Sequence, residues 1–108
     1  MVNFDHYTYR VTWSEDDQEF VGLCAEFPSL SCLDETKVGA FEGIGEVVRA
    51  VIEELVESGE PVPQPYSERK YSGNFQVRLL PEQHRALAIE AAETGVSLNR
   101  LVCAKLST

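Results

Sequence analysis

Three polar side chains, Asn74, Gln76 and Arg78, alternate with apolar residues along the segment 74–80. This period of two is typical of a strand with one polar and one apolar face. An Arg side chain can form two parallel hydrogen bonds with guanine, and Asn or Gln can do the same with adenine. A strand that presents these three side chains could therefore read base edges in the major groove of DNA.

The segment 74–80 has no candidate partner strand after it, because Pro81 and two helical patterns follow. An unpaired strand leaves a row of backbone N–H and C=O groups without hydrogen bonds. One solution is pairing with an upstream strand of the same chain. The other is antiparallel pairing with the same strand of a second copy. In that arrangement Phe75, Val77 and Leu79 form a dimer core, and the three polar side chains face outward.

The two helical patterns begin and end at residues that favour helix termini. Pro81 suits a first helical position, Gly95 is expected to end that helix, and Ser97 is expected to cap the next. The backbone amides around Ser97, Leu98 and Asn99 then form a site suited to phosphate contact. Strand and helices together span about 35 residues, a size that usually requires disulfides, a metal or a second copy.

Residues 1–60 have the pattern of a separate α+β unit. The segment 7–13 alternates aromatic or aliphatic residues with polar ones, and the more apolar segment 20–27 follows an acidic turn, so the two predict a hairpin. Residues 30–33 form a short third strand. The fold class is therefore α+β, with a small three-stranded antiparallel sheet covered by one helix.

That helix is expected to begin after Thr36, a favourable N-cap, and to run to about Ser58, with Gly59 ending it. Its glycines weaken it, and close packing of helix on sheet would compensate. The apolar face that should cover the sheet consists of Phe41, Ile44, Gly45, Val48, Val51, Ile52, Leu55 and Val56.

Three prolines at alternate positions, Pro61, Pro63 and Pro65, separate the two halves. Each proline removes a backbone donor and fixes φ, so the run predicts a stiff, extended connector. The expected organisation is an α+β domain over 1–60, a linker over 61–73 and a strand-helix-helix domain over 74–108. Pairing of residues 66–73 with the first sheet stays open.

The net charge of −9 is spread unevenly along the chain. Residues 1–66 hold three basic and fourteen acidic side chains, whereas residues 67–108 hold six basic and four acidic ones. Such asymmetry suggests two kinds of partner, one for each half. The alternative interpretation is an acidic surface that serves solubility alone.

The sequence gives little indication of metal binding, membrane insertion or catalysis. The scattered residues Cys24, Cys32 and Cys103 form no C-x-x-C pair, which predicts reduced thiols and a cytoplasmic location without a metal site or cofactor. We expect no signal peptide and no membrane span, because no apolar run approaches the necessary length. We expect no catalytic residues either, since no nucleophile–base arrangement or glycine-rich phosphate loop stands out.

The second half resembles the ribbon-helix-helix pattern of Arc- and MetJ-type repressors. The resemblance rests on the segment 74–78, on Pro81 and Glu82, on Gly95 and on the segment 97–99. It implies that Asn74, Gln76 and Arg78 contact bases and that Ser97, Leu98 and Asn99 contact phosphate.

The chain as a whole resembles the HicB antitoxin family, through the order of four stretches, 25–28, 33–36, 59–63 and 95–99. The resemblance implies a reduced RNase H-like first domain that binds and neutralises a HicA-like mRNA-cleaving toxin. It also implies a homodimer or higher oligomer whose second domain binds operator DNA and represses its own operon. The alternative function is a protein-interaction module whose ribbon-helix-helix part serves mainly for dimerisation.

Nuclease activity of the RNase H type is the competing hypothesis from another class. It would require several carboxylates, such as Asp5, Glu26, Asp34 and Glu35, to converge on two metal ions. So short a unit offers few elements to arrange them, and the sequence therefore predicts a protein that is not an enzyme.

Overall fold

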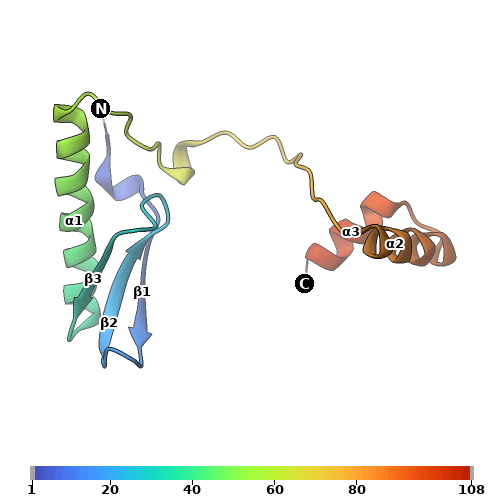
Figure 1. Cartoon of the computed structure of the whole chain (residues 1–108), viewed down its shortest axis with the longest axis horizontal. Helices are drawn as coiled ribbons and strands as arrows, with labels where there is room; N and C mark the ends of the chain where they lie inside the picture. Colours follow the sequence, from blue (N-terminus) through green and yellow to red (C-terminus); the bar gives the residue numbers. More distant parts are fainter. Residues whose placement is uncertain (1, 108) are drawn as a thin grey trace. The chain divides into compact units, whose positions relative to one another are not determined.

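The computed structural model of the chain describes residues 2–107 (Figure 1). Two compact units make up the chain, residues 1–71 and residues 72–108. The first contains the sheet and the long helix, and the second contains the two C-terminal helices.

The sheet of the first unit is built from strands β1 (Tyr9–Ser14), β2 (Glu19–Cys24) and β3 (Ser31–Asp34). Within residues 2–107 these strands form one antiparallel sheet in the order β1-β2-β3. A short 3₁₀ helix, η1 (Phe4–His6), precedes β1. The expected hairpin and third strand are thus confirmed.

Helix α1 (Lys37–Glu57) lies along one face of this sheet (Figure 1). Its start is fixed by Thr36, whose side-chain oxygen accepts the N–H of Gly39 at 3.0 Å. Gly59, just beyond its end, has a φ of 70°, in the left-handed region that favours glycine. Both predicted helix boundaries are confirmed.

The buried face of α1 is narrower than the sequence pattern suggests. Side chains at every fourth position are buried, and Ile44 and Val48 are completely so. Phe41 and Val56 were expected on this face but are 55% and 62% exposed. A three-stranded sheet covers only a narrow stripe of a helix, so an apolar face this wide leaves its margins in solvent. The core cluster consists of Tyr7, Cys24, Phe27, Ile44, Val48 and Ile52.

Close packing of α1 on the sheet depends on glycines of both elements. In α1, a Cβ on Gly39 or Gly43 would meet the side chain of Asp34 or Cys32 of β3, so the expected compensation holds at these two positions. A Cβ on Gly22 would meet the backbone oxygen of Ala40 and would lie 2.9 Å from the Cβ of Ile44. A Cβ on Gly45, by contrast, would have no other atom within 4 Å, so close packing does not explain this glycine. The expected compensation for helix glycines therefore fails at this position.

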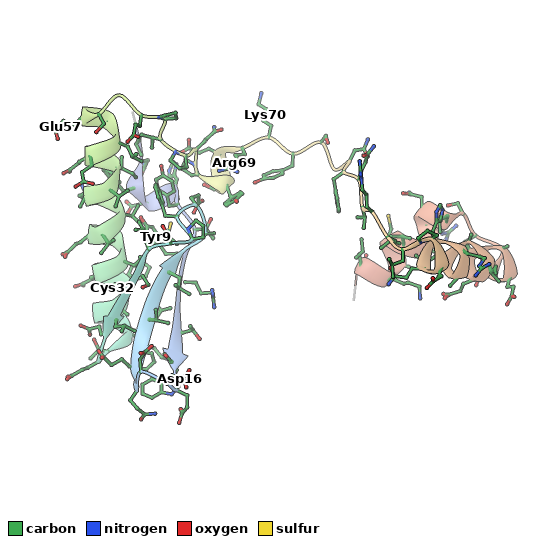
Figure 2. All side chains as sticks on the ribbon, in the orientation of Figure 1. Tyr9, Asp16, Cys32, Glu57, Arg69 and Lys70 are labelled. Carbon is green, nitrogen blue, oxygen red and sulfur yellow. The ribbon has the colours of Figure 1, made fainter. Side chains whose placement is uncertain are left out.

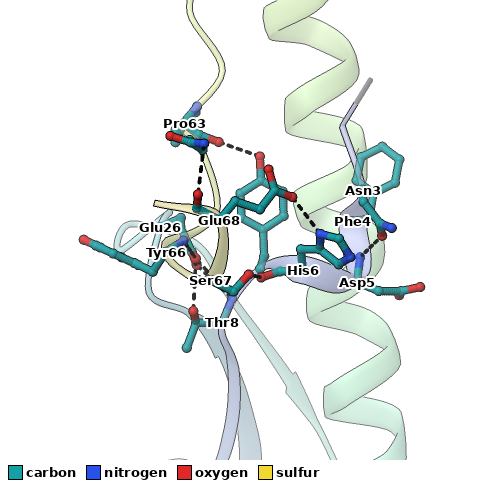
Figure 3. Close-up of polar contacts among 12 residues, drawn as sticks. Asn3, Phe4, Asp5, His6, Thr8, Glu26, Pro63, Tyr66, Ser67 and Glu68 are labelled. Carbon is teal, nitrogen blue, oxygen red and sulfur yellow. Dashed lines mark hydrogen bonds and ion pairs between the residues drawn. The ribbon is translucent and has the colours of Figure 1, made fainter. Parts of the chain in front are cut away.

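The expected linker differs from the structure. Residues up to Tyr71 belong to the first unit, so most of the segment 61–73 is attached rather than free. It includes a second 3₁₀ helix, η2 (Tyr66–Glu68). The backbone N–H of Tyr66 donates to the carboxylate of Glu26 at 2.8 Å (Figure 3). Proline fixes the backbone but leaves neighbouring amides and carbonyls available, and side chains of the first unit bind them.

The second unit contains helices α2 (Pro81–Thr94) and α3 (Leu98–Leu106). Gly95 ends α2 with a φ of 78°, and the Ser97 hydroxyl caps α3 by accepting the N–H of Arg100 at 3.1 Å. The helix signals at Pro81, Gly95 and Ser97 are all confirmed. Among the described residues, no helix is both long enough and apolar enough to cross a bilayer.

The two contrasting glycines give the first prediction. Gly22→Ala should lower the free energy of unfolding by about 1–3 kcal/mol, because the added methyl overpacks the helix–sheet contact. Gly45→Ala should raise it by up to about 1 kcal/mol, because alanine favours the helix and the space is open. Urea denaturation of both variants measures the two changes. Equal effects at the two positions would contradict this packing.

Candidate dimerisation and nucleic-acid-binding surface

The segment 74–80 is extended but unpaired. Within residues 2–107 it belongs to no strand, and the sheet consists of β1, β2 and β3 alone. Its apolar side chains are left in solvent, with Phe75 74%, Val77 61% and Leu79 46% exposed. Pairing with an upstream strand of the same chain, one of the two solutions left open by the sequence, is therefore not what the structure shows.

These three side chains share one apolar groove of about 860 Å³ in the second unit. Alternation along the segment places them on one side, and the helices supply the other walls. Leu87 of α2 and Leu98 of α3 are among the helix residues that line the groove. The residues that the sequence assigned to a dimer core thus gather on one surface, although their role in a dimer stays a prediction.

The polar residues of the segment lie apart from the groove. Asn74, Gln76 and Arg78 are all exposed and alternate with the groove residues. An extended backbone directs successive side chains to opposite sides, so the three share the side away from the helices. Their predicted contact with bases stays a prediction.

At the start of α3 the side chains and the backbone amides have different roles. The hydroxyl of Ser97 is engaged as the helix cap, and the side chains of Leu98 and Asn99 line the groove. Phosphate contact at this position would therefore fall to the first backbone amides of the helix, which have no intrahelical acceptor.

Two further groove residues were missed by the sequence analysis. Neither His84 nor Lys105 was assigned a role from the sequence, yet both line the groove. Lys105 also pairs with Glu90 of α2 at 3.1 Å, which joins the two helices. Helical spacing could have found both, since His84 lies three residues before Leu87 and Lys105 lies three residues after Val102.

Residues 57–106, slightly less than half of the chain, match the model of the HicB family. The match supports membership of the HicB family. It begins at the end of α1 and continues through both helices of the second unit, so it includes the groove. No curated protein and no solved structure matches the chain. Membership of the HicB family suggests an antitoxin role in a toxin–antitoxin pair.

The first unit is strongly acidic. Residues 1–71 hold fifteen acidic and five basic side chains. Figure 2 shows Asp16 at the tip of the β1–β2 hairpin, with Arg69 and Lys70 at the opposite end of the unit. Among the described residues, no three His, Cys, Asp or Glu side chains are grouped to hold a metal ion.

One carboxylate of the first unit is buried. Glu26 is 8% exposed and accepts the backbone N–H of Thr8 at 2.9 Å, its hydroxyl at 3.0 Å and the N–H of Tyr66 at 2.8 Å. Burial alone would raise the pKa of Glu26, but the hydrogen bonds from Tyr66 and Thr8 outweigh it and lower the pKa below its usual value. Glu26 is therefore ionised at neutral pH and acts as an acceptor only.

The pKa of Tyr9 is shifted in the opposite direction, upward. The hydroxyl of Tyr9 donates to the backbone oxygen of Phe4 at 2.9 Å, and burial is the largest of the causes that raise its pKa to about 12. Burial likewise raises the pKa of Tyr7, with the charge of Glu26 adding to the effect. The neutral phenols are thus the forms that fit the fold.

These shifts give a prediction for alkaline solution. Between pH 10 and about 12 an unfolded Tyr9 ionises while the folded one stays neutral, so the free energy of unfolding should fall as the pH rises through this range. In Tyr9→Phe the free energy of unfolding should fall less steeply with pH. Ionisation of Tyr7 should account for part of the fall that remains. Denaturant titrations at several pH values measure it, with the exposed Tyr71→Phe as control. An unchanged slope in Tyr9→Phe would contradict the assignment.

Proposed function

We propose that the protein is the antitoxin of a type II toxin–antitoxin pair. The first unit binds and neutralises a HicA-like mRNA-cleaving toxin, and the second unit forms a ribbon-helix-helix homodimer that represses its own operon. The observation that carries the proposal is the extended, unpaired segment 74–80, whose three apolar side chains lie exposed over an apolar groove.

A second copy of the chain is the occupant that meets every requirement of this surface. It supplies an identical strand, which pairs antiparallel and satisfies the free backbone groups of both segments. It also covers Phe75, Val77 and Leu79 with its own apolar groove. A unit of this size gains a larger core in the same step, which it needs in the absence of disulfides.

The dimer would present a two-stranded ribbon to DNA. Pairing leaves Asn74, Gln76 and Arg78 of both chains on the face opposite the helices, and a β-ribbon of this kind fits the major groove. The amides at the start of α3 then lie at a helix N-terminus, which favours phosphate. Base reading and phosphate anchoring would thus come from different elements of the same unit.

The first unit has the charge expected of a surface for a basic protein. An mRNA-cleaving toxin must bind a polyanion, so its substrate-binding surface is expected to be basic. The acidic side chains of residues 1–71 provide a complementary field, which increases the rate of encounter.

A protein-interaction module that uses its second unit for dimerisation alone is the second candidate. The charge of that unit favours it, because residues 72–108 hold four basic and three acidic side chains, few cations for a DNA-binding surface. DNA binding and dimerisation therefore need separate tests.

Val77→Asp tests dimerisation. Each subunit would place an uncompensated carboxylate in a dry interface, at a cost of several kcal/mol per charge. The variant should lose the dimer and DNA binding together, whereas residues 1–71 stay folded and bind the toxin. Sedimentation velocity and circular dichroism measure the outcome. A folded, dimeric Val77→Asp protein would show that this segment is not the interface.

Arg78→Ala tests base reading without disturbing the dimer. Loss of one specific side chain should weaken binding to the upstream promoter by about 1–3 kcal/mol. Arg85→Ala removes the same charge from an exposed position on α2 and should weaken binding less and without sequence preference. Gel-shift titration on promoter and scrambled DNA separates the two. Equal losses for both variants would contradict base reading by Arg78, and absence of binding to the promoter by the unmodified protein would favour the module that only dimerises.

The toxin contact is tested with the first unit alone. The fragment 1–71 should bind a HicA-like toxin, and the association rate constant should fall as salt rises, because screening shortens the reach of opposite charges. Stopped-flow mixing at several ionic strengths measures the rate. A rate independent of salt would remove the electrostatic argument, and absence of binding would remove the assignment of this unit.

A further inference from the structure

The segment 61–71, here called the strap, is attached to the first unit by hydrogen bonds at several points along its length (Figure 3). Near its start the Tyr7 hydroxyl donates to the backbone oxygen of Pro63 at 2.6 Å. Further along, the Ser67 hydroxyl donates to the backbone oxygen of His6 at 2.7 Å. The strap therefore follows the beginning of β1 and the turn before it, rather than leaving the unit after α1.

Glu26 is the central attachment. Its carboxylate accepts from Thr8, at the entry to β1, and from the N–H of Tyr66 in the strap, residues far apart in the sequence. It is the one buried charged side chain among residues 2–107, and its bonds come from neutral donors. Hydrogen bonds to an ionised acceptor are about twice as strong as those between neutral groups. Loss of the Tyr66 donor would leave this buried charge short of a partner.

Two apolar contacts also hold the strap, because Val62 packs against the core cluster and Pro65 is buried. The remaining polar contacts are at the surface. His6 Nδ1 lies 2.7 Å from Glu68 Oε2, and both side chains are well exposed. Within the strap itself, the guanidinium of Arg69 lies 4.0 Å from the ring centre of Tyr66, and its Nε donates to the backbone oxygen of Gln64 at 3.0 Å. Exposed ion pairs contribute little to stability, so these contacts shape the strap but do not decide whether it stays attached.

We propose that the strap is a latch, held closed by Glu26, that sets the length of free chain between the two units. This inference is independent of the identity of toxin and operator. With the latch closed, the chain that is free between the strap and the segment 74–80 is residues 72–73. With the latch open, the free chain begins after Gly59 and comprises residues 60–73.

The difference in reach is large. At about 3.5 Å per extended residue, the free chain spans at most roughly 7 Å when the latch is closed and roughly 49 Å when it is open. The effective concentration of one unit near the other falls with about the −3/2 power of tether length, so a sevenfold longer tether lowers it up to about 20-fold. A partner that touches both units of one chain would therefore bind differently in the two states.

The test changes the strap rather than the buried carboxylate. Tyr66→Pro removes the N–H that Glu26 accepts, and position 66 opens a 3₁₀ helix, where proline is tolerated. Tyr66→Ala is the matched control, because it removes the same ring but keeps the N–H. Spin labels on the exposed positions Glu53 and Glu93 of the full chain report the distribution of distances between the units.

The expected result is a clearly broader distribution in Tyr66→Pro than in Tyr66→Ala. Hydrogen exchange at the Thr8 amide should rise about tenfold or more in Tyr66→Pro, as expected when a bond to a charged acceptor is lost nearby. Glu26→Gln, with a neutral side chain of the same shape, should shift both readouts in the same direction. Distributions and exchange rates that are the same in Tyr66→Pro and Tyr66→Ala would overturn the proposal.

Discussion

The central constraint on this structure is the amphipathic segment 74–80. It needs hydrogen-bond partners for its backbone and a cover for its apolar side chains. The backbone groups of Asn74 and Leu80 are hydrogen-bonded at the two ends of the segment, but those of residues 75–79 have no partner among the described residues. The chain provides neither a strand for them nor a cover for Phe75, Val77 and Leu79. Both needs cost free energy when unmet. A self-complementary partner would meet both, and this is the reason for proposing a homodimer.

The two units solve the problem of a small core in different ways. The first packs α1 on three strands, with Gly22 permitting close approach and the strap covering the entry to β1. The second has helices too short to enclose a core and leaves an open groove. A self-sufficient acidic unit joined to an incomplete one suits a protein that binds one partner through each half, and the Glu26 latch controls how far apart the halves can move.

Local signals in the sequence predicted most of the secondary structure. Thr36, Gly95 and Ser97 fixed helix termini because capping depends on residues only a few positions away. The sequence left the attachment of residues 66–73 open because the decisive bond joins Glu26 to an amide 40 residues later, and no periodicity encodes such a pair. The lone carboxylate in the apolar run 20–27 was the available signal. The hydrophobic periodicity predicted too wide a buried face for α1, because it does not show how much of the helix the sheet covers.

The most direct measurement is hydrogen exchange of the amides of residues 74–80 as a function of protein concentration. If two copies pair through this segment, alternate amides should be strongly protected in concentrated solution and should lose protection on dilution below the dimer dissociation constant. Amides in α1 should keep their protection throughout and so serve as an internal reference. Amides in 74–80 that exchange freely at every concentration would contradict the pairing on which the proposed function rests.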